Sequence, residues 1–423
     1  MSNRLVKLIK NEYVFSIISR VFSVLISLGQ SVIVARYLGA SLQGVNSYIT
    51  SITNIGAIVI TFGMHQAYPY FRKKYGKEAV FNEYMSLIML LYLVYISIAA
   101  VFMLFKPVSI EVRVAVLLIP VFGYSKIVAY ICLIERPNLR NFWWTMVGLL
   151  DVVYVFLLMK FTERSFIYAV SILLFAELLK SVVYTIALKP KITISKNMAK
   201  LAYELVKYGF FPMMALLMTT LNYKVDVLML KQYSYISSAM IGVYSLGIQM
   251  AERIIMIPDT LKGVLVSRLS KGSDEHEVAS VCRLAFWASG VTCLAFLILG
   301  KFVIQILYGS EYEGAYMPLM ICSFGTIAIS YFKLIAQYNI VNKKQILNVE
   351  MLSIAVLTDV ILNLLFIPIW GINGAALATG IGNLVCGVTF LIWFCNKFNI
   401  SYGEMTLPQK SDIAFLKKLL GKQ

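Results

Sequence analysis

Charged side chains inside long apolar stretches are the residues of this 423-residue sequence whose chemistry is most informative. A charged group in the middle of a membrane helix costs about 2.5 to 3.5 kcal/mol on insertion scales, unless it faces water or a partner. Three basic residues lie deep in such stretches, namely Arg20, Lys224 and Arg253. At about 1.5 Å per helical residue they would sit at successive depths, as a ladder of cations through a membrane. Pairing with acidic residues on other helices is the alternative explanation.

Two acidic residues and an amide lie in the same kind of apolar stretch. Asp226 is only two residues from Lys224, so the two side chains point to opposite helix faces and do not neutralise each other there. Asp359 and Asn363 are four residues apart and share one helix face. They form either a hydrogen-bonded packing contact, which is the commoner case, or part of a cation or proton site. Asp226, Asp359 and Asn363 are therefore candidates for coupling to H⁺ or Na⁺.

Other charged residues in these stretches have simpler explanations. Glu177 and Lys180 are three residues apart, which favours an ion pair on one helix face, and the same spacing relates Asp259 to Lys262. Lys333 lies near the end of a stretch, where a long side chain can reach the membrane interface, but it is equally a candidate for the ladder of cations. The same reach would serve Lys126, Lys160, Arg283 and Glu350.

Motifs for catalysis and metal binding are not found in the sequence. It contains no GxxxxGK[ST], HExxH or GxSxG motif, so ATP hydrolysis, metalloproteolysis and serine hydrolysis are not predicted. The six cysteines lie mostly inside apolar stretches without a CxxC pair, and there are only two histidines. Neither a disulfide framework nor a zinc site is predicted from them. We expect a protein that is not an enzyme and that holds no cofactor or metal.

The elements that must position these residues are membrane-spanning helices. The chain is 60% hydrophobic and 14% charged with a mean hydropathy of +0.78, whereas a soluble domain carries about 25% charged residues. Its apolar residues fall in blocks of about 20, the length of helix that crosses a hydrocarbon core of about 30 Å. We predict an all-α polytopic membrane protein with about twelve spans. They are 13–35, 45–65, 84–105, 114–134, 142–161, 165–188, 209–230, 240–266, 278–300, 316–338, 346–366 and 374–394.

The basic residues between these spans predict the orientation of the chain. The net charge is +17, and lysines and arginines are concentrated in alternate loops, roughly 23 on one side against 6 on the other. Because cytoplasmic loops carry such an excess, both termini are expected in the cytoplasm. Charge placed in this way sets topology, and no nucleic-acid partner is expected. The N-terminal stretch, basic at Arg4, Lys7 and Lys10, is predicted to be a retained first helix.

A basic loop almost midway along the chain predicts two halves. This loop, 189–207, divides six predicted spans from six. We therefore expect an N-terminal lobe over 1–188, a C-terminal lobe over 208–394 and a cytoplasmic tail over 395–423. The loops between spans are too short to hold a separate soluble domain.

Motifs spread over nearly the whole chain have an order and spacing typical of one family. They are Arg36-Tyr37-Leu38-Gly39 with Gly44, Tyr208-Gly209 with Pro212, Asp226 with Val227-Leu228-Met229-Leu230, Gly242-Val243-Tyr244, and Asn363 with Ile367-Pro368, Gly371-Ile372 and Gly374-Ala375-Ala376-Leu377-Ala378-Thr379. Together they resemble the Wzx-type oligosaccharide flippases of polysaccharide biosynthesis. This family lies in the multidrug/oligosaccharidyl-lipid/polysaccharide exporter superfamily.

The resemblance implies two six-helix lobes around a central cavity that opens alternately to the two faces of the inner membrane. Flippases of this family move an undecaprenyl-diphosphate-linked repeat unit to the outer leaflet, for O-antigen, capsule or exopolysaccharide. A diphosphate needs cations in a path of low dielectric constant. The candidate diphosphate-binding residues are therefore Arg20, Lys224, Arg253 and Lys333. The implied partners are the lipid-linked oligosaccharide, membrane lipids, a polysaccharide polymerase and a chain-length regulator.

Other functions also fit a polytopic chain of this kind. A cation-coupled multidrug exporter of the same superfamily resembles this architecture but would be expected to carry an acidic cavity. A lipid II flippase usually has helices beyond twelve, and none is predicted here. An envelope-glycan polymerase or acyltransferase would normally need a large external loop or an intramembrane histidine.

Overall fold

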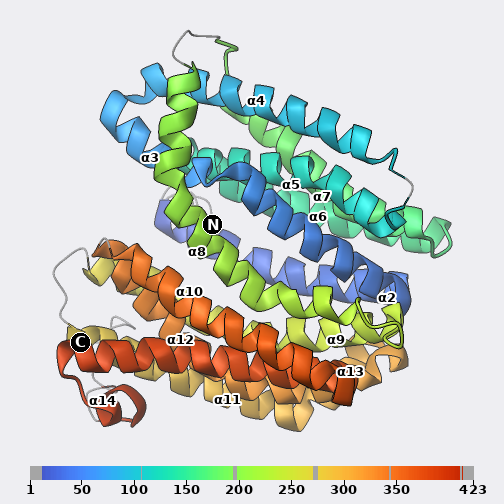
Figure 1. Cartoon of the computed structure of the whole chain (residues 1–423), viewed down its shortest axis with the longest axis vertical. Helices are drawn as coiled ribbons and strands as arrows, with labels where there is room; N and C mark the ends of the chain where they lie inside the picture. The colour runs from blue at the N-terminus through green and yellow to red at the C-terminus, as the bar shows by residue number, and fades with distance from the viewer. Residues whose placement is uncertain are drawn as a thin grey trace, which may run out of the picture. The chain divides into compact units, whose positions relative to one another are not determined.

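The computed structural model of the chain consists of α-helices and short 3-10 turns, with no strand among the described residues (Figure 1). It describes residues 12–105, 107–193, 198–269, 275–342, 344–409 and 412. Within helices, residues 12–21, 23, 24, 77–79, 264, 267 and 268 are described by their backbone alone. The predicted all-α class is confirmed.

The chain divides into two compact units, Met1–Leu217 and Met218–Gln423, and each is described by itself. Helix α8 (Met198–Leu230) contributes residues to both. The first unit also contains α2 (Glu12–Thr61), α3 (Met64–Tyr75), α4 (Lys77–Phe102), α5 (Ile110–Glu135), α6 (Pro137–Phe161) and α7 (Phe166–Leu188). The second contains α9 (Ser238–Ala251), η1 (Glu252–Ile255), α10 (Met256–Leu269), α11 (Glu275–Tyr308), η2 (Ser310–Ala315), α12 (Tyr316–Val341), α13 (Gln345–Phe398) and α14 (Tyr402–Thr406). The predicted boundaries of the lobes and tail stay a prediction.

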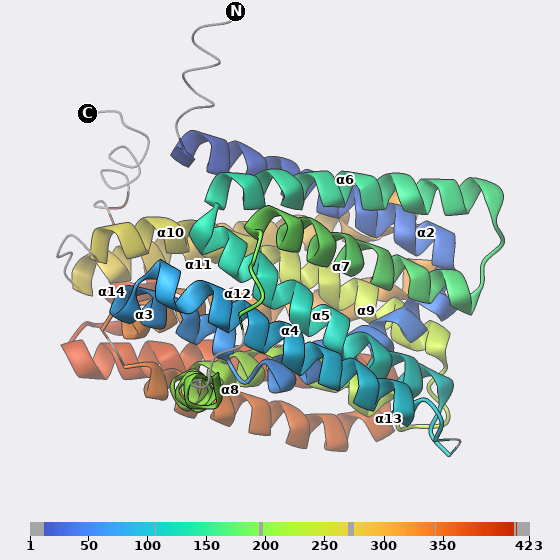
Figure 2. The ribbon, with the colours of Figure 1, turned by 90° about the horizontal axis from the view of Figure 1, so that it is seen from above.

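Each unit is a bundle organised around a few helix contacts. In the first unit, α2 packs against α5 and α6, and α7 packs against α5 and α6 in turn. Figure 2 shows α4 to α7 running nearly parallel. In the second unit, α12 contacts α9, α10, α11 and α13, and its buried side chains lie at the centre of that bundle.

Two very long helices each consist of two helices joined at a glycine. α2 has 50 residues and α13 has 54, far more than the about 20 that cross a membrane. The backbone leaves the helical conformation at Gly39, with φ 68° and ψ 172°, and at Gly371, with φ 55° and ψ −130°. Glycine accepts such positive φ values at little cost. Among the described residues ten helical stretches are long and apolar enough to span a membrane. Since two of them are double, the structure agrees with the prediction of about twelve spans.

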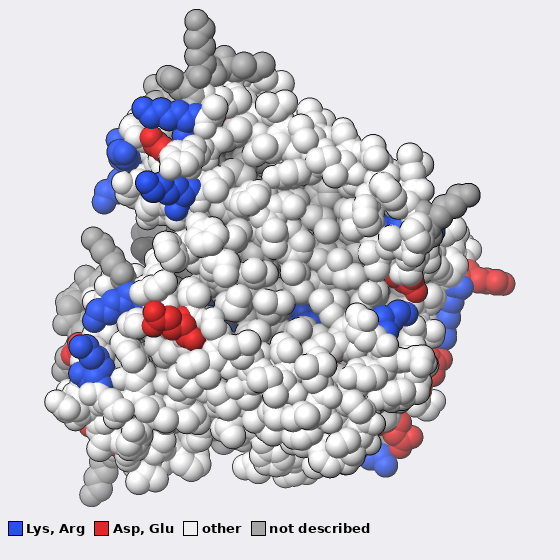
Figure 3. All heavy atoms as spheres, viewed as in Figure 1, with Lys and Arg blue, Asp and Glu red and all other residues white. Residues whose placement is uncertain are grey.

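The surfaces of the helices are those of a multi-pass membrane protein. Large apolar side chains remain exposed along their lengths, as at Leu93 on α4 and Ile298 on α11, which are 64% and 78% exposed. In Figure 3, Lys, Arg, Asp and Glu gather near helix ends, and the area between them is almost uncharged. An apolar band between charged ends matches the hydrocarbon core and its two interfaces.

The segment after α13 packs onto the end of the second unit. Met405 and Ile400 are buried in its core, and Trp287 Nε1 donates to the carbonyl of Thr406 over 2.8 Å. Arg283 on α11 is 1% exposed. Its guanidinium donates to both carboxylate oxygens of Asp412, one of them over 2.7 Å, and to a backbone carbonyl. The charge of Arg283 is thus paired within the protein, and its reach to the membrane interface stays a prediction.

Candidate functional site

Two of the predicted cations lie in the second unit and face acidic partners on other elements. Lys224 on α8 places Nζ 3.6 Å from Oε1 of Glu252 in η1. Lys333 on α12 places Nζ 3.6 Å from Oδ2 of Asp259 on α10. These distances exceed the about 2.7 to 2.9 Å of a tight charge-assisted hydrogen bond. Both lysines are thus held loosely, with side chains that are 28% and 16% exposed.

Arg253 and Arg20 are the other two predicted cations. Arg253 follows Glu252 in η1, the 3-10 turn that separates α9 from α10, and is half-buried. A 3-10 segment between two helices often marks a hinge. Arg20 lies on α2, but its side chain is outside the described residues. The structure therefore brings three of the four candidate cations into the second unit, and their role in binding a diphosphate stays a prediction.

The predicted acidic residue Asp226 is the centre of a buried polar cluster. Its side chain is 1% exposed and accepts hydrogen bonds from the hydroxyls of Tyr244 on α9 and Thr379 on α13, the latter over 3.3 Å. The backbone N–H of Val227 donates to its other oxygen over 2.7 Å. Lys224 takes no part in these hydrogen bonds, as the two-residue spacing predicts.

Asp359 and Asn363 complete this cluster on α13. The Asn363 amide donates to Oδ1 of Asp359 over 3.0 Å, so the predicted sharing of one helix face is confirmed. Both residues are buried, and Asp359 Oδ2 and Asn363 Oδ1 have no hydrogen-bond partner within the described part of the chain. The charge of Asp226 also acts on Asp359. Gly382 leaves room beside Asp359, because a Cβ there would lie 2.9 Å from the Asp359 Cβ.

A second set of buried polar residues adjoins this part of the second unit, and the sequence analysis did not identify it. Asn222 on α8 donates to Asn383 on α13 over 2.9 Å, and Asn383 donates to Thr326 on α12 over 3.4 Å. All three side chains are at most 3% exposed. Neutral amides inside predicted spans were the available signal, since buried amides must find partners.

The buried cluster offers more acceptors than donors. Two carboxylates and an amide oxygen lie near Thr379, and within the described residues Asp359 Oδ2 and Asn363 Oδ1 have no hydrogen-bond partner. A shared proton or a small cation would remove the repulsion between the carboxylates and satisfy these oxygens. Oxygen ligands of this kind suit a hard cation. In the described part of the chain, no group of three His, Cys, Asp or Glu side chains forms a metal site.

Two ion pairs predicted within helices are confirmed. Lys180 Nζ lies 2.5 Å from Glu177 Oε1 on α7, and Lys262 Nζ lies 3.8 Å from Asp259 Oδ1 on α10. Asp259 is therefore shared between Lys262 and Lys333. Sharing weakens the hold of this carboxylate on either lysine.

Comparison with known proteins identifies the fold. No family model matches the chain. A stretch of 111 residues, 25% of this chain, is 33% identical to an uncharacterized membrane protein of Methanocaldococcus jannaschii, and spans 21% of that relative. The lipid II flippase MurJ, in an inward closed conformation, superposes with a TM-score of 0.70 at 17% identity, over 96% of this chain and 95% of that chain.

Multidrug transporters share the same architecture. An inward-facing MATE family transporter of the MOP superfamily gives a TM-score of 0.63 at 14% identity, over 91% of this chain and 96% of that chain. A MOP superfamily transporter from Pyrococcus furiosus, described as having a binding pocket of reverse polarity, gives 0.54 at 12% identity, over 93% and 96%. The chain is thus a multi-pass membrane protein with the fold that these transporters share.

Proposed function

We propose that this chain is a flippase of the multidrug/oligosaccharidyl-lipid/polysaccharide exporter superfamily. It carries an undecaprenyl-diphosphate-linked oligosaccharide across the cytoplasmic membrane by alternating access of two lobes. The shared fold with a lipid II flippase supports a lipid-linked substrate. The proposal includes cytoplasmic termini, and a polysaccharide polymerase and a chain-length regulator as partners.

The observation that carries the proposal is the loose pairing of Lys224 and Lys333. Each ammonium is 3.6 Å from a partly exposed carboxylate of another element. A diphosphate presents charged oxygens that form stronger, shorter hydrogen bonds to an ammonium. It would therefore replace Glu252 and Asp259 as the partner of these lysines. In the absence of substrate the two carboxylates keep the cations from being isolated in the membrane.

Coupling to H⁺ or Na⁺ is part of the same proposal. Asp359, Asn363, Asp226 and Thr379 would hold the ion. The support is the pair of buried oxygens without donors, Asp359 Oδ2 and Asn363 Oδ1. Because these residues join α8 to α13, an ion bound there would change how the two helices pack. Binding of the ion would therefore shift the equilibrium between two conformations of the protein.

A multidrug exporter is the second candidate, and the shared fold with a MATE family transporter favours it. Such an exporter handling cationic drugs would meet repulsion from Lys224, Arg253 and Lys333. The cationic positions therefore favour an anionic substrate. The Pyrococcus furiosus transporter of reverse pocket polarity is consistent with a fold that accepts either polarity.

Reconstitution distinguishes the two candidates. Purified protein in proteoliposomes would be given an undecaprenyl diphosphate carrying a short oligosaccharide, and exposure of the glycan would be followed by digestion with an external glycosidase. The expected result is that the protein renders all of the glycan accessible, whereas empty liposomes leave the inner half protected. Efflux of ethidium without any movement of the glycan would instead establish the exporter.

Substitution of Asp359 tests whether flipping is coupled to a gradient of H⁺ or Na⁺. Asp359→Asn keeps the hydrogen bond with Asn363 possible but removes the charge that holds an ion. We expect flipping to continue without its dependence on an imposed Na⁺ or proton gradient. Thr358→Val, at the neighbouring, partly exposed position of α13, should keep that dependence. An unchanged gradient dependence in Asp359→Asn would reject the role of this cluster.

A further inference from the structure

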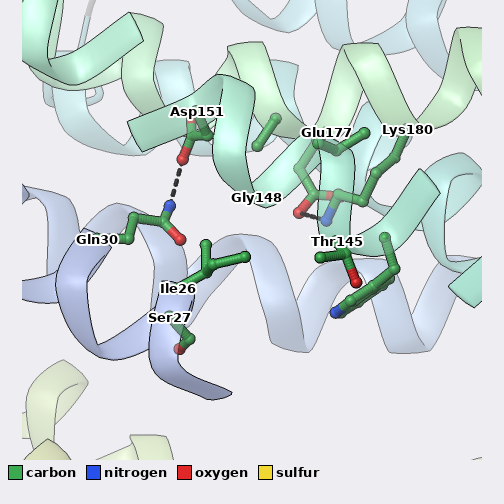
Figure 4. Close-up of a pocket in the computed structure, with 11 residues that line it drawn as sticks. Ile26, Ser27, Gln30, Thr145, Gly148, Asp151, Glu177 and Lys180 are labelled. Atoms are coloured by element: carbon green, nitrogen blue, oxygen red, sulfur yellow. Dashed lines mark hydrogen bonds and ion pairs between the residues drawn. The ribbon is translucent and has the colours of Figure 1, made fainter. Parts of the chain in front are cut away.

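A polar pocket lies within the first unit, between α2, α6 and α7 (Figure 4). Its volume is about 240 Å³. The polar residues that line it include Gln30, Thr145, Asp151, Glu177 and Lys180. This volume is about eight times the share of one water in the liquid, and smaller than the about 300 Å³ at which pockets for drug-sized ligands begin. The pocket therefore fits a small group of several polar atoms.

One end of the pocket presents a carboxylate that lacks a donor. Asp151 on α6 is 1% exposed, and its Oδ2 accepts a hydrogen bond from the amide of Gln30 on α2, as the dashed line in Figure 4 shows. Its Oδ1 is buried and has no hydrogen-bond partner among the described residues. Burial of an acceptor in this state is unfavourable until a donor reaches it. Asp151 Oδ1 is closed off from the pocket space, so a ligand O–H or N–H group reaches it when the Asp151 side chain turns toward the pocket.

The other end presents an ammonium and a carboxylate that is already satisfied. Glu177 receives hydrogen bonds from Lys180 and from the hydroxyl of Ser125, both at 2.5 Å. Lys180 also lies 5.1 Å from the ring centre of Trp144. An ammonium has three N–H donors, so Lys180 can donate to a ligand oxygen while it stays paired with Glu177.

We infer that this pocket binds a neutral sugar residue of the transported glycan. Each sugar hydroxyl is a donor and an acceptor at once, so one ring can donate to Asp151 and accept from Lys180. The apolar walls, such as Ile26 and Val147, suit the C–H faces of the ring. A bare ion would leave most of the volume unfilled and would not need Lys180. This inference rests on the proposed flippase function and assigns sugar recognition to the first unit.

Binding measurements with lipids that differ only in the attached sugar test this inference. The full-length protein in nanodiscs would be titrated with undecaprenyl diphosphate and with undecaprenyl diphosphates that each carry one glucose, galactose, rhamnose, N-acetylglucosamine or N-acetylgalactosamine. We expect at least one of the sugar-bearing lipids to bind on the order of tenfold more tightly than the sugar-free lipid, as one or two net hydrogen bonds provide. Asp151→Asn and Gln30→Met should each remove most of this preference and leave the affinity for the sugar-free lipid unchanged. Thr292→Val, at a partly exposed position of α11 in the second unit, should retain the preference.

The outcomes separate this inference from the proposed function. Equal affinity of the unsubstituted protein for all of the lipids, or a preference that survives both pocket substitutions, would overturn the sugar site while the flippase stands. No binding of any lipid diphosphate would reject the flippase itself. If Asp151→Asn instead altered only a dependence on Na⁺ or pH, equally for every lipid, the pocket would be an ion site and the inference would be wrong.

Discussion

Lys224 and Asp226 show how neighbouring charged residues in one membrane helix take separate partners. Lys224 faces Glu252 at 3.6 Å, whereas Asp226 is enclosed by Tyr244 and Thr379. Asp226 is well supplied with donors, so it can remain buried. Lys224 has a distant partner and a side chain that is 28% exposed, so its charge remains available to a ligand.

Substitution of Lys224 and of its partner Glu252 tests whether the charge of Lys224 binds the diphosphate. Lys224→Gln should lower the flipping rate by about 10- to 100-fold, because it removes a charge-assisted hydrogen bond of about 1.5 to 3 kcal/mol to the diphosphate. Lys224→Arg should keep partial activity because the charge is retained. Glu252→Gln should change the rate little, since the carboxylate only holds the lysine while substrate is absent.

The control for this experiment is the amount of protein in the membrane. If Lys224 and Glu252 form a structural pair instead, each single substitution should lower that amount, and the double variant should restore it. If the double variant restores the amount of protein and the protein that remains flips the lipid normally, Lys224 has a structural role.

Residues close in sequence were the ones whose pairing could be predicted. Glu177 with Lys180 and Asp359 with Asn363 follow from the helical period alone. The bond between Arg283 and Asp412 joins residues 129 apart, and no local rule brings them together. The bond between Gln30 and Asp151 was not predictable for the same reason, because these residues are 121 apart.

At the scale of elements, the backbone conformation at the break in α13 requires a glycine. Gly371 has φ 55° and ψ −130°, a region that is strained for any residue with a Cβ. Crowding is not the obstacle, because an added Cβ would meet only Ile236 Cδ1, at 3.5 Å. Gly371→Ala should therefore destabilise the protein by about 1 to 3 kcal/mol.

Thermal unfolding in detergent would measure this effect. Gly290→Ala is the matched control, since Gly290 lies inside α11 and an added Cβ there meets no atom within 4 Å. Alanine at that position should stabilise the helix by up to about 1 kcal/mol. Equal melting temperatures for the two variants would contradict the assignment of Gly371 as a required break.

The chain after α13 is docked by a buried ion pair between Arg283 and Asp412, beside a more exposed contact of His276 with Glu404. Burial alone favours the protonated form of Asp412, but the hydrogen bonds from Arg283 and from the Gln409 N–H outweigh it and hold the pKa below its usual 3.8. A carboxyl with a lowered pKa stabilises the folded state fully above its unfolded pKa. That contribution is lost as the pH falls through the lower, folded value.

Limited proteolysis of the segment 399–409 would report on this docking. Cleavage should be slow and constant from about pH 8 to about pH 5, and should rise only below 3.8. Asp412→Asn should expose the segment at neutral pH, at a cost on the order of 3 kcal/mol, because it leaves the Arg283 charge buried without a counterion. Tyr402→Phe, at an exposed position of α14, leaves the contacts of Arg283 intact and should stay protected. Rapid cleavage of the unsubstituted protein at neutral pH would show that the segment is not docked.

The predicted spans correspond closely to the helices, because blocks of about 20 apolar residues are a strong signal. Gly39 and Gly371, where α2 and α13 leave the helical conformation, fall between the predicted spans 13–35 and 45–65 and between 346–366 and 374–394. The helix contacts of α12 were not predictable, as they depend on packing between segments distant in sequence.

For the whole molecule, the number of crossings between two positions predicts whether they lie on the same side of the membrane. Seven of the ten spanning stretches lie between Lys73 and Ser310, which are both exposed. An odd number of crossings puts these two residues on opposite sides, whichever side is cytoplasmic. The excess of basic residues predicts that Lys73 is on the cytoplasmic side.

Labelling of single cysteines tests this orientation directly. The six native cysteines are all buried and would be removed first, and a single cysteine would then replace Lys73 or Ser310. In intact cells a membrane-impermeant maleimide should label the cysteine at position 310 and not the one at 73, and both should react after the cells are opened. Labelling of position 73 alone would reverse the orientation but keep the helix count. Labelling of both positions in intact cells would mean an even number of crossings between them, and one of the seven helices would then lie along the membrane surface or turn back within it.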